Sequence, residues 1–412
     1  MRQLLPFLLF LFYFSVIYGQ KLPLIAGKPE SSIIPSRSWQ NIKHFSTFEM
    51  PFEQYRKYLI GAVPAENNQG NVAPITLPMP DGSTRTFEIM SSTVMEPEIQ
   101  SRYPEIKTFK GTDGTHYMRM ICTDHWIKAY VLDEAGDIII EPYSTVSKDW
   151  YGVYYSNDIN IEEAALSRIC GESGHNILRQ ELNKSDRDNQ LISRTVLGSN
   201  PVSLITYRIA VSCTGEFGQA PALGGGSVAT IIAKIADALT YANAVYEKDF
   251  AIHFNMANNN DRIVFTDPDT DPFENNGSGG FLLGQNTTIV NARVGTFLYD
   301  IGHVFTNSCT DVGGIANLGV VCSKESKANG VTCWYTSDVA YVAQRIFCHE
   351  MGHQFSASHT FSNCNGNESG TMYEPGGGTT IMSYQGLCGA LNLESTNPPH
   401  PNFFHSCSLE QV

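Results

Sequence analysis

The sequence predicts an α/β layered domain that follows a β-rich domain, and three observations support this prediction. Residues 20 to about 145 alternate apolar runs with turn signals, as expected of short strands. A polar and charged stretch from 167 to 199 separates them from the rest of the chain. From residue 202 onward, strand-like and helix-like patterns alternate, which is typical of a sheet covered by helices.

Turn signals divide the first domain into strands. They are PDGS at Pro80 to Ser83, GTDG at Gly111 to Gly114 and DEAGD at Asp133 to Asp137. The polar stretch from 167 to 199 contains several basic residues and no sustained periodicity, so we expect an exposed, protease-accessible linker.

The second domain opens with the strand-like SLITYRIAVS at 203–212, and a second strand-like run, FAIHFNM, occupies 250–256. Between them, apolar residues fall on one face of a helix: Ile232, Ile235, Leu239 and Ala242. A later helix should begin with Ser337 or Asp338 as its N-cap. We therefore expect strand and helix to alternate around one layered sheet.

Composition and the N-terminus exclude some functions and suggest a location. The formal net charge is -14 and no basic run with interleaved aromatics occurs, so nucleic acid is not expected as a partner. Residues 1–19 combine Arg2, an apolar run from Leu4 to Tyr18 and a small residue, Gly19, which indicates a secretory signal peptide. The run is short for a membrane anchor. We expect an exported, extracellular protein without a membrane span once the signal is removed.

Ten cysteines in an exported chain favour disulfides over free thiols. Cys122 and Cys170 lie early, and the other eight lie between residues 213 and 407. The late part should therefore be the cross-linked one, although sequence does not give the pairing. Cys348, inside a predicted helix, is equally consistent with a buried free thiol.

The stretch CHEMGHQFSASHTF, Cys348 to Phe361, holds three of the eleven histidines. His349 and His353 continue the apolar stripe of the preceding helix, and residues four apart lie on one helical face, close enough to share an ion. Zinc suits two such imidazoles, and Glu350 is placed to act on a water molecule as general base. HExxH therefore predicts a catalytic metal site.

His359 is the candidate for a third ligand. It lies six residues after His353, about 240° around a continuing helix, so the helix must end near Phe355 or Ser356 for His359 to turn back. Three protein ligands would leave one position open, as catalysis requires. The alternative third ligand, Glu374, lies in the loop sequence YEPGGG, and we favour His359.

These residues carry a resemblance to a known family. HEMGHQFSASH resembles the HExxHxxGxxH zinc signature of the metzincin metalloproteases. GGIANLGVVC (313–322) resembles the edge strand of the reprolysin, or adamalysin-like, branch, and YDIGHVF (299–305) and ITYRIAVSCTGEF (205–217) are similar to segments of bacterial secreted reprolysin-like proteases. ITLPMPDGS and VMEPEIQSRYPEIKTF resemble their propeptides. The resemblance implies an α/β zincin (metzincin) catalytic domain with a twisted mixed sheet, an active-site helix and a Met-turn.

The resemblance also implies roles for further residues. Met382, in TIMSYQGLCG, would form the Met-turn beneath the zinc, and Tyr384 matches a tyrosine that contacts the metal or the transition state in other branches; the alternative for Tyr384 is packing. Cys170 loosely resembles a propeptide cysteine switch, and the alternative, which we favour, is a disulfide with Cys122. Substrate would bind along the edge strand at Gly314, Ile315, Ala316, Asn317, Leu318 and Gly319.

Three positions depart from the family pattern. Ser356 stands where the family has glycine, in a turn that needs a left-handed backbone, which costs a non-glycine residue about 1 to 2 kcal/mol. Thr360 replaces an aspartate that follows the third histidine in adamalysins. Arg208 stands about where they have a calcium-binding glutamate, so the resemblance does not imply their calcium site.

We thus expect a signal peptide at 1–19, a propeptide at 20–198 (β-rich domain plus linker) and a metzincin-like catalytic domain at 199–412. The predicted function is that of a secreted zinc metalloendopeptidase made as a zymogen, with one catalytic Zn²⁺ and with protein or peptide substrates and its own propeptide as partners. The alternative is a zinc-stabilised extracellular binding module with weakened catalysis. Glu350 favours the enzyme, because a binding module has no use for a general base.

Overall fold

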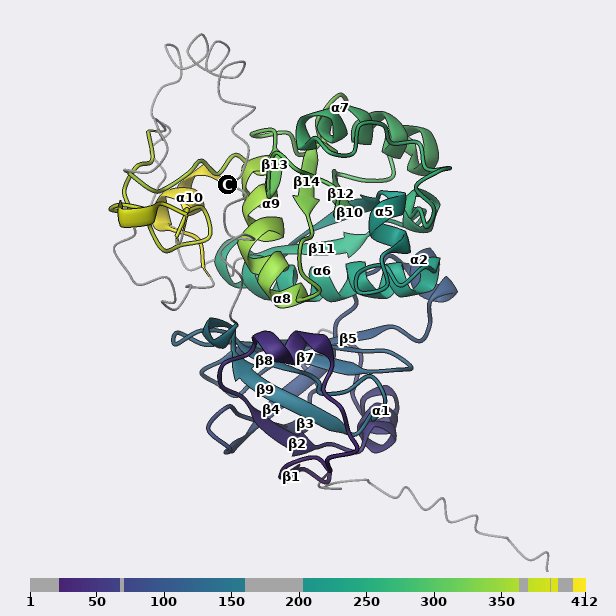
Figure 1. The fold of residues 1–412 in the computed structure, drawn as a ribbon, viewed down its shortest axis with the longest axis vertical. Coiled ribbons are helices and arrows are strands. Elements are labelled where there is room, and N and C mark those ends of the chain that lie inside the picture. Colours follow the sequence, from purple (N-terminus) through teal and green to yellow (C-terminus); the bar gives the residue numbers. More distant parts are fainter. Residues whose placement is uncertain (1–21, 67–69, 160–202, 363–369, 386, 392–402) are drawn as a thin grey trace, which may run out of the picture.

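The computed structural model describes residues 22–66, 70–159, 203–362, 370–385, 387–391 and 403–412. It contains an N-terminal nine-stranded sheet and a C-terminal five-stranded sheet with helices on both faces (Figure 1). The predicted signal peptide, the predicted linker and Cys170 lie outside the described residues.

The N-terminal sheet is antiparallel throughout, in the order β1-β2-β9-β8-β7-β6-β5-β4-β3. The three predicted turns each join neighbouring strands of this sheet, because the apolar runs on either side pair as hairpins. Its strands are β1 (Ile25–Ala26), β2 (Ser46–Glu49), β3 (Ala73–Pro78), β4 (Thr84–Ser91), β5 (Lys107–Thr112), β6 (Tyr117–Cys122), β7 (Ile127–Leu132), β8 (Ile138–Pro142) and β9 (Trp150–Tyr155). Its helices are η1 (Arg37–Asn41), α1 (Phe52–Gly61), α2 (Pro97–Arg102) and η2 (Ser156–Asp158).

The C-terminal sheet is mixed, as expected, in the order β11-β10-β12-β14-β13. Only the last pair, β14 with β13, is antiparallel, which places β13 at one edge of the sheet. The strands are β10 (Ile205–Cys213), β11 (Ile252–Met256), β12 (Ile301–Thr306), β13 (Gly314–Ala316) and β14 (Gly330–Cys333). Helix α6 (Val228–Phe250) and the helix that carries the histidines pack on one face, and α7 (Gly279–Val290) packs on the other (Figure 1). Shorter helices are α5 (Gly215–Gln219), η3 (Asn260–Ile263), η4 (Asn291–Gly295), η6 (Gly389–Leu391) and α10 (Ser406–Gln411).

Helix α6 is the central helix of the molecule. The Ser227 side chain caps it by accepting a hydrogen bond from Thr230 N, and Ala251 ends it in a left-handed conformation with φ 55°. Among the described residues α6 alone is long and apolar enough to cross a membrane, yet 72% of that window is buried inside the protein. Its apolarity is explained by packing on both sides.

The helix that carries the histidines is continuous from α8 (Val339–Val342) through a π-helical segment, η5 (Ala343–Phe347), into α9 (Cys348–Gln354). Asp338 is its N-cap, with Oδ1 accepting from Tyr341 N at 2.9 Å. The sequence predicted the cap but not the π segment, which adds a residue to the turn directly before α9.

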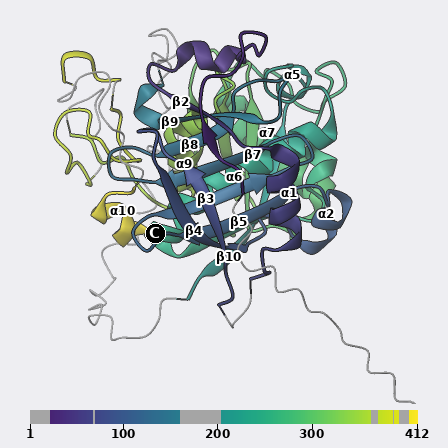
Figure 2. The same ribbon diagram turned by 90° about the horizontal axis from the view of Figure 1, so that it is seen from below.

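The N-terminal domain packs against α6 and shares one apolar core with it (Figures 1 and 2). Arg119 of β6 is fully buried and pairs with Glu247 of α6, with Nε donating to Oε2 at 3.1 Å. Backbone pairing extends across the junction, because Met256 N of β11 donates to Val94 O at 2.7 Å. The two domains therefore form one packed unit in the described residues.

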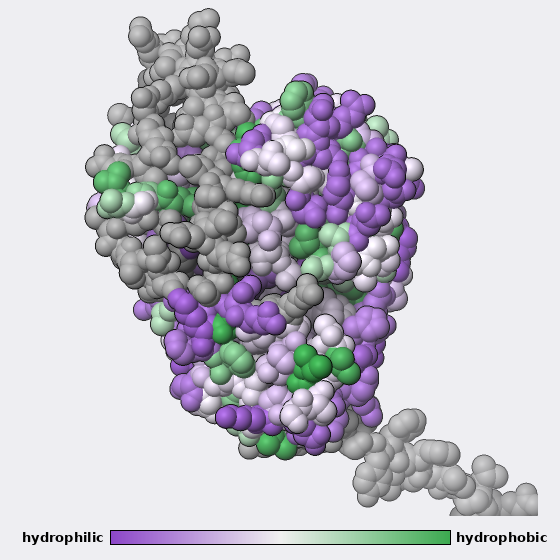
Figure 3. Space-filling model, viewed as in Figure 1, coloured by the Kyte–Doolittle hydropathy of each residue, from purple (hydrophilic) through white to green (hydrophobic). Residues whose placement is uncertain are grey.

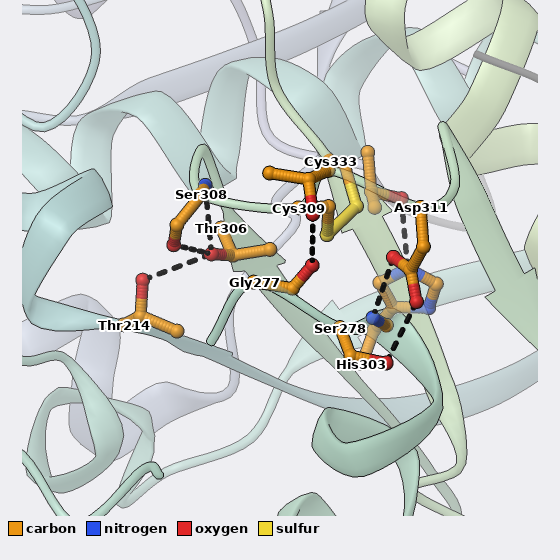
Figure 4. The surroundings of a disulfide bond; sticks show 12 residues. Thr214, Gly277, Ser278, His303, Thr306, Ser308, Cys309, Asp311 and Cys333 are labelled. Carbon is orange, nitrogen blue, oxygen red and sulfur yellow. Dashed lines mark hydrogen bonds between the residues drawn. A yellow bond between two sulfur atoms is a disulfide. The ribbon is translucent and has the colours of Figure 1, made fainter. Parts of the chain in front are cut away.

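A disulfide joins Cys309 to Cys333 and fixes the loop that leads into β13 (Figure 4). In the same loop the Asp311 carboxylate accepts from Ser278 Oγ at 2.7 Å and Gly279 N at 3.0 Å. Cys388 is also disulfide-bonded. The late part of the chain is therefore cross-linked only in part. Among its described cysteines, Cys213, Cys322, Cys348 and Cys407 are free thiols, against the expectation that disulfides would outnumber free thiols.

The favoured disulfide between Cys122 and Cys170 is wrong, because Cys122 is a free thiol. It ends β6 inside the N-terminal core, where it is 0% exposed, and its Sγ donates to Thr123 O. A side chain enclosed by its own sheet has no room for a partner from outside that core.

The molecular surface in Figure 3 shows polar side chains alternating with small, separate apolar patches. Exposed large apolar side chains are scattered along the chain, among them Ile34, Val146 and Phe297. Scattered apolar residues are normal on protein surfaces. The described part of this face therefore gives no sign of one broad apolar docking area.

The ion pair at the junction between the domains should make the free energy of unfolding depend on pH in the acid range. Burial alone would raise the pKa of Glu247, but the charge of Arg119 and hydrogen bonds from His253 and Arg119 lower it from 4.5 to about 2. A carboxyl group whose pKa is lower in the folded protein stabilises the fold at pH values above its pKa in the unfolded chain. This stabilisation, about 3 kcal/mol, is lost as the pH falls through 4.5 towards 2. We expect the difference in unfolding free energy between wild type and Glu247→Gln, measured by urea titration, to shrink between pH 5 and pH 2. A difference that stays constant over that range would contradict the assignment.

Candidate active site

The three predicted histidines meet at one point. His359 Nε2 lies 3.1 Å from His353 Nε2 and 3.2 Å from His349 Nε2. All three side chains are buried, with exposures of 2 to 7%. They form a group of potential ligand atoms within 4.8 Å of one another.

Backbone carbonyls orient the two helical histidines. His349 Nδ1 donates to Ile381 O at 2.7 Å, and His353 Nδ1 donates to Ala357 O at 2.8 Å. Because a carbonyl can only accept, each Nδ1 carries the proton and each Nε2 presents a lone pair to the common point. Burial also lowers the pKa of His349 to about 4, although the hydrogen bond to Ile381 raises it. The lowered pKa favours the neutral ring that a metal requires.

A reversal of the chain at Ser356 brings His359 back. Helix α9 ends at Gln354, Ser356 adopts φ 82°, and Ala357 N donates to Gly352 O at 2.9 Å. This is the left-handed turn that the sequence led us to expect at a position without glycine. Gly319 N caps the same helix end by donating to His353 O at 2.9 Å.

Further contacts hold the segment that carries His359. Thr371 Oγ1 donates to His359 O at 2.7 Å, and Thr360 N donates to Met382 O at 3.1 Å. Just before the histidine, Ser358 N donates to Gln411 Oε1 of α10 at 2.9 Å. The backbone around His359 is therefore held by three separate stretches of chain.

The geometry fits a tetrahedral metal ion. Metal–nitrogen bonds of about 2.0 to 2.1 Å place two tetrahedral ligand nitrogens about 3.3 Å apart. The two separations between ring nitrogens, 3.1 and 3.2 Å, are close to this value. Three imidazole nitrogens that converge on one point can hold a divalent metal ion and leave its fourth position open.

Glu350 lies beside the histidines and against the edge strand. Its side chain is 1% exposed, and a Cβ added at Gly314 would lie 2.5 Å from Glu350 Oε1. The carboxylate therefore packs directly on the backbone of β13. Only glycine at 314 allows this close approach.

The predicted substrate strand is shorter than expected. Gly314, Ile315 and Ala316 form the edge strand β13. Asn317 N still donates to Asn329 O at 3.1 Å, but Leu318 and Gly319 lie in a turn outside the strand. Gly319 has φ 66°, and its amide is used to cap α9. The helix end thus takes the chain away from the sheet, and the prediction of an edge strand through Gly319 is wrong.

Met382 and Tyr384 both pack against residues of the histidine helix or the histidine group. Met382 is fully buried beneath α9, since a Cβ at Gly352 would lie 2.6 Å from its Sδ. The ring of Tyr384 stacks on Phe361 at 4.3 Å and meets His359 edge-on at 4.7 Å. Both residues pack on the site.

Several contributors were not predicted from the sequence. The carbonyls of Ile381 and Ala357 carry no sequence signal, because any residue supplies one. Gly352 could have been recognised as a glycine inside a helix, which often marks close packing. Glu374, considered only as a ligand, is buried and accepts hydrogen bonds from both sides of the site.

Cys348 adjoins His349 in sequence but takes no part in the histidine group. It is a buried free thiol, as one alternative proposed, and burial raises its pKa well above the ordinary value. A neutral thiol in this position is a core residue.

The strain at Ser356 can be measured. Ser356→Gly should raise the free energy of unfolding by about 0.5 to 1 kcal/mol, because relief of about 1 to 2 kcal/mol of left-handed strain exceeds the added flexibility of the unfolded chain. Ala251→Gly, at φ 55° and the end of α6, is the matched control and should stabilise by a similar amount. If Ser356→Gly destabilises while Ala251→Gly stabilises, the Ser356 side chain has a role beyond occupying the turn.

Comparison with known proteins identifies the family of this chain. Residues 204–409, half of the chain, match the model of the reprolysin-like metallopeptidases of family M12B. The crystal structure of metalloproteinase-II from Bacteroides fragilis is similar at a TM-score of 0.45 and 11% identity, covering 86% of this chain and 94% of that chain. No curated protein matches. The chain belongs to the reprolysin-like M12B family of metallopeptidases.

Proposed function

We propose that this protein is a secreted zinc-dependent metalloendopeptidase that is synthesised as a zymogen. The observation that carries the proposal is the convergence of three imidazole nitrogens beside a buried glutamate, next to the free edge of a sheet. Family membership implies protein or peptide substrates. A binding module would not require the glutamate at this place.

His349, His353 and His359 would hold the zinc ion, and Tyr384 is a further proposed contributor. Bound there, zinc supplies Lewis acidity towards a substrate carbonyl and makes a water molecule easier to deprotonate. Glu350 accepts the proton of the attacking water and then delivers it to the leaving amine. Its burial against Gly314 keeps the carboxylate in one orientation for both transfers.

Strand β13 is the proposed recognition element for substrate. It lies at the sheet edge, and its outer side is available to pair with an extended peptide backbone. Because Gly314 also contacts Glu350, a peptide paired with β13 would lie next to the proposed base.

The segment 1–19 is proposed as the signal peptide and 20–198 as the propeptide. Support comes from the apolar N-terminal run and from the separate nine-stranded domain that packs on α6. Cys170 remains proposed as a switch cysteine, and Met382 as the Met-turn residue. Amino-terminal sequencing of the protein in culture medium tests the domain boundaries, and a start before residue 160 would contradict removal of the N-terminal domain.

Replacement of Glu350 by Gln should leave zinc bound and lower the rate of peptide cleavage by about 10²- to 10⁴-fold, because only the general base is lost. Cleavage of a quenched fluorescent peptide and zinc content by mass spectrometry check the two parts. Glu325→Gln, on the exposed surface, is the control. Wild-type cleavage by Glu350→Gln would refute the role of Glu350. In the same assay Tyr384→Phe keeps the stacked ring, so unchanged cleavage would assign Tyr384 to packing alone.

Gly314→Ala should reduce kcat while zinc content stays unchanged. The added methyl group would lie 2.5 Å from Glu350 Oε1 and 2.6 Å from Ile346 Cγ2, so the carboxylate or the strand must shift. Gly284→Ala in α7 is the matched control, because a Cβ there meets nothing within 4 Å. Equal kcat for the two variants would show that the contact between Gly314 and Glu350 is dispensable.

A further inference from the structure

Glu374 lies between the segment that carries His359 and the segment 379–382, which contacts the histidine helix. It follows the segment that carries His359 and pairs with it, since Glu374 N donates to Thr360 O at 2.8 Å. Its side chain is only 7% exposed, although it is a carboxylate. A buried carboxylate is costly unless its oxygens are hydrogen-bonded.

Both carboxylate oxygens of Glu374 accept hydrogen bonds. Oε2 accepts from the hydroxyls of Thr360 and Thr380, the latter at 2.5 Å. Oε1 accepts from the amides of Thr379 and Thr380 at 2.8 and 3.0 Å, and from Thr379 Oγ1 at 3.3 Å. No ion pair within the described residues involves Glu374, so hydroxyl and amide donors alone hold its charge.

The donors belong to the two stretches that orient the histidines. Thr360 directly follows His359. Thr380 directly precedes Ile381, whose carbonyl accepts from the His349 ring. The next residue is Met382, whose carbonyl accepts from Thr360 N. The Glu374 carboxylate therefore joins the segment that carries His359 to the segment whose carbonyl orients His349.

We propose that Glu374 is a positioning residue that preorganises His359 and His349 for metal binding by joining Thr360 to Thr379 and Thr380. The proposal rests on the proposed zinc site. Glu374 does not bind the metal itself. Its contribution is to reduce the number of arrangements that the three imidazoles adopt before an ion arrives.

The replacement Glu374→Gln tests this proposal in the full-length chain. A glutamine keeps the shape but replaces one acceptor oxygen by an NH₂ group, which cannot accept from the threonine donors. Competition with a chromophoric chelator should show zinc affinity about 10- to 100-fold weaker than wild type, the usual effect of losing a residue that orients ligands. Asp311→Asn is the control, because the exposed Asp311 carboxylate accepts from Ser278 Oγ and Gly279 N and is not part of the histidine group.

The thermal unfolding midpoint of the metal-free proteins separates positioning from general stability. The proposal is supported if Glu374→Gln loses zinc affinity, Asp311→Asn does not, and the midpoint of Glu374→Gln shows that it is folded at the assay temperature. It is overturned if folded Glu374→Gln binds zinc as wild type does, whether or not its midpoint is lower. Thr360→Val, which removes a single hydroxyl at nearly constant shape, provides the same test should Glu374→Gln fail to fold. Absence of zinc binding by the wild type would instead overturn the proposed function.

Discussion

The reversal of the chain at Ser356 is the constraint on which the site depends. A helix can present only two of the three imidazoles to one point, so the third must return after the helix has ended. The left-handed serine, the hydrogen bond from Ala357 N to Gly352 O and the caps from the Gly319 loop together fix where α9 stops. The strain at one residue is thereby offset by hydrogen bonds on both sides of it.

The surrounding fold makes this reversal rigid. Met382 and Phe404 fill the space beneath Gly352, and Gln411 of α10 holds Ser358. On the other side, α9 packs on β13 and β14, and α6 connects it to the N-terminal domain through one continuous core. The metal site is therefore supported by residues from both ends of the described chain.

Much of this arrangement could be predicted from the sequence because it depends on periodicity and on residue type. The spacing of His349 and His353, the Asp338 cap, the layered α/β arrangement and the need for a turn before His359 all follow from local patterns, whereas the mixed sheet was expected only from the family resemblance. Other features depend on contacts distant in sequence. The free Cys122 thiol, the short strand β13 and the clustering of threonine donors around Glu374 are set by tertiary packing, which no local pattern encodes.

X-ray absorption spectroscopy at the zinc edge tests the central claim most directly, because it reports the atoms around the ion in solution. The account predicts one zinc per chain with three imidazole nitrogens at about 2.0 to 2.1 Å and one further light-atom ligand. Sulfur scattering at about 2.3 Å, two imidazoles instead of three, or no stoichiometric metal would contradict it.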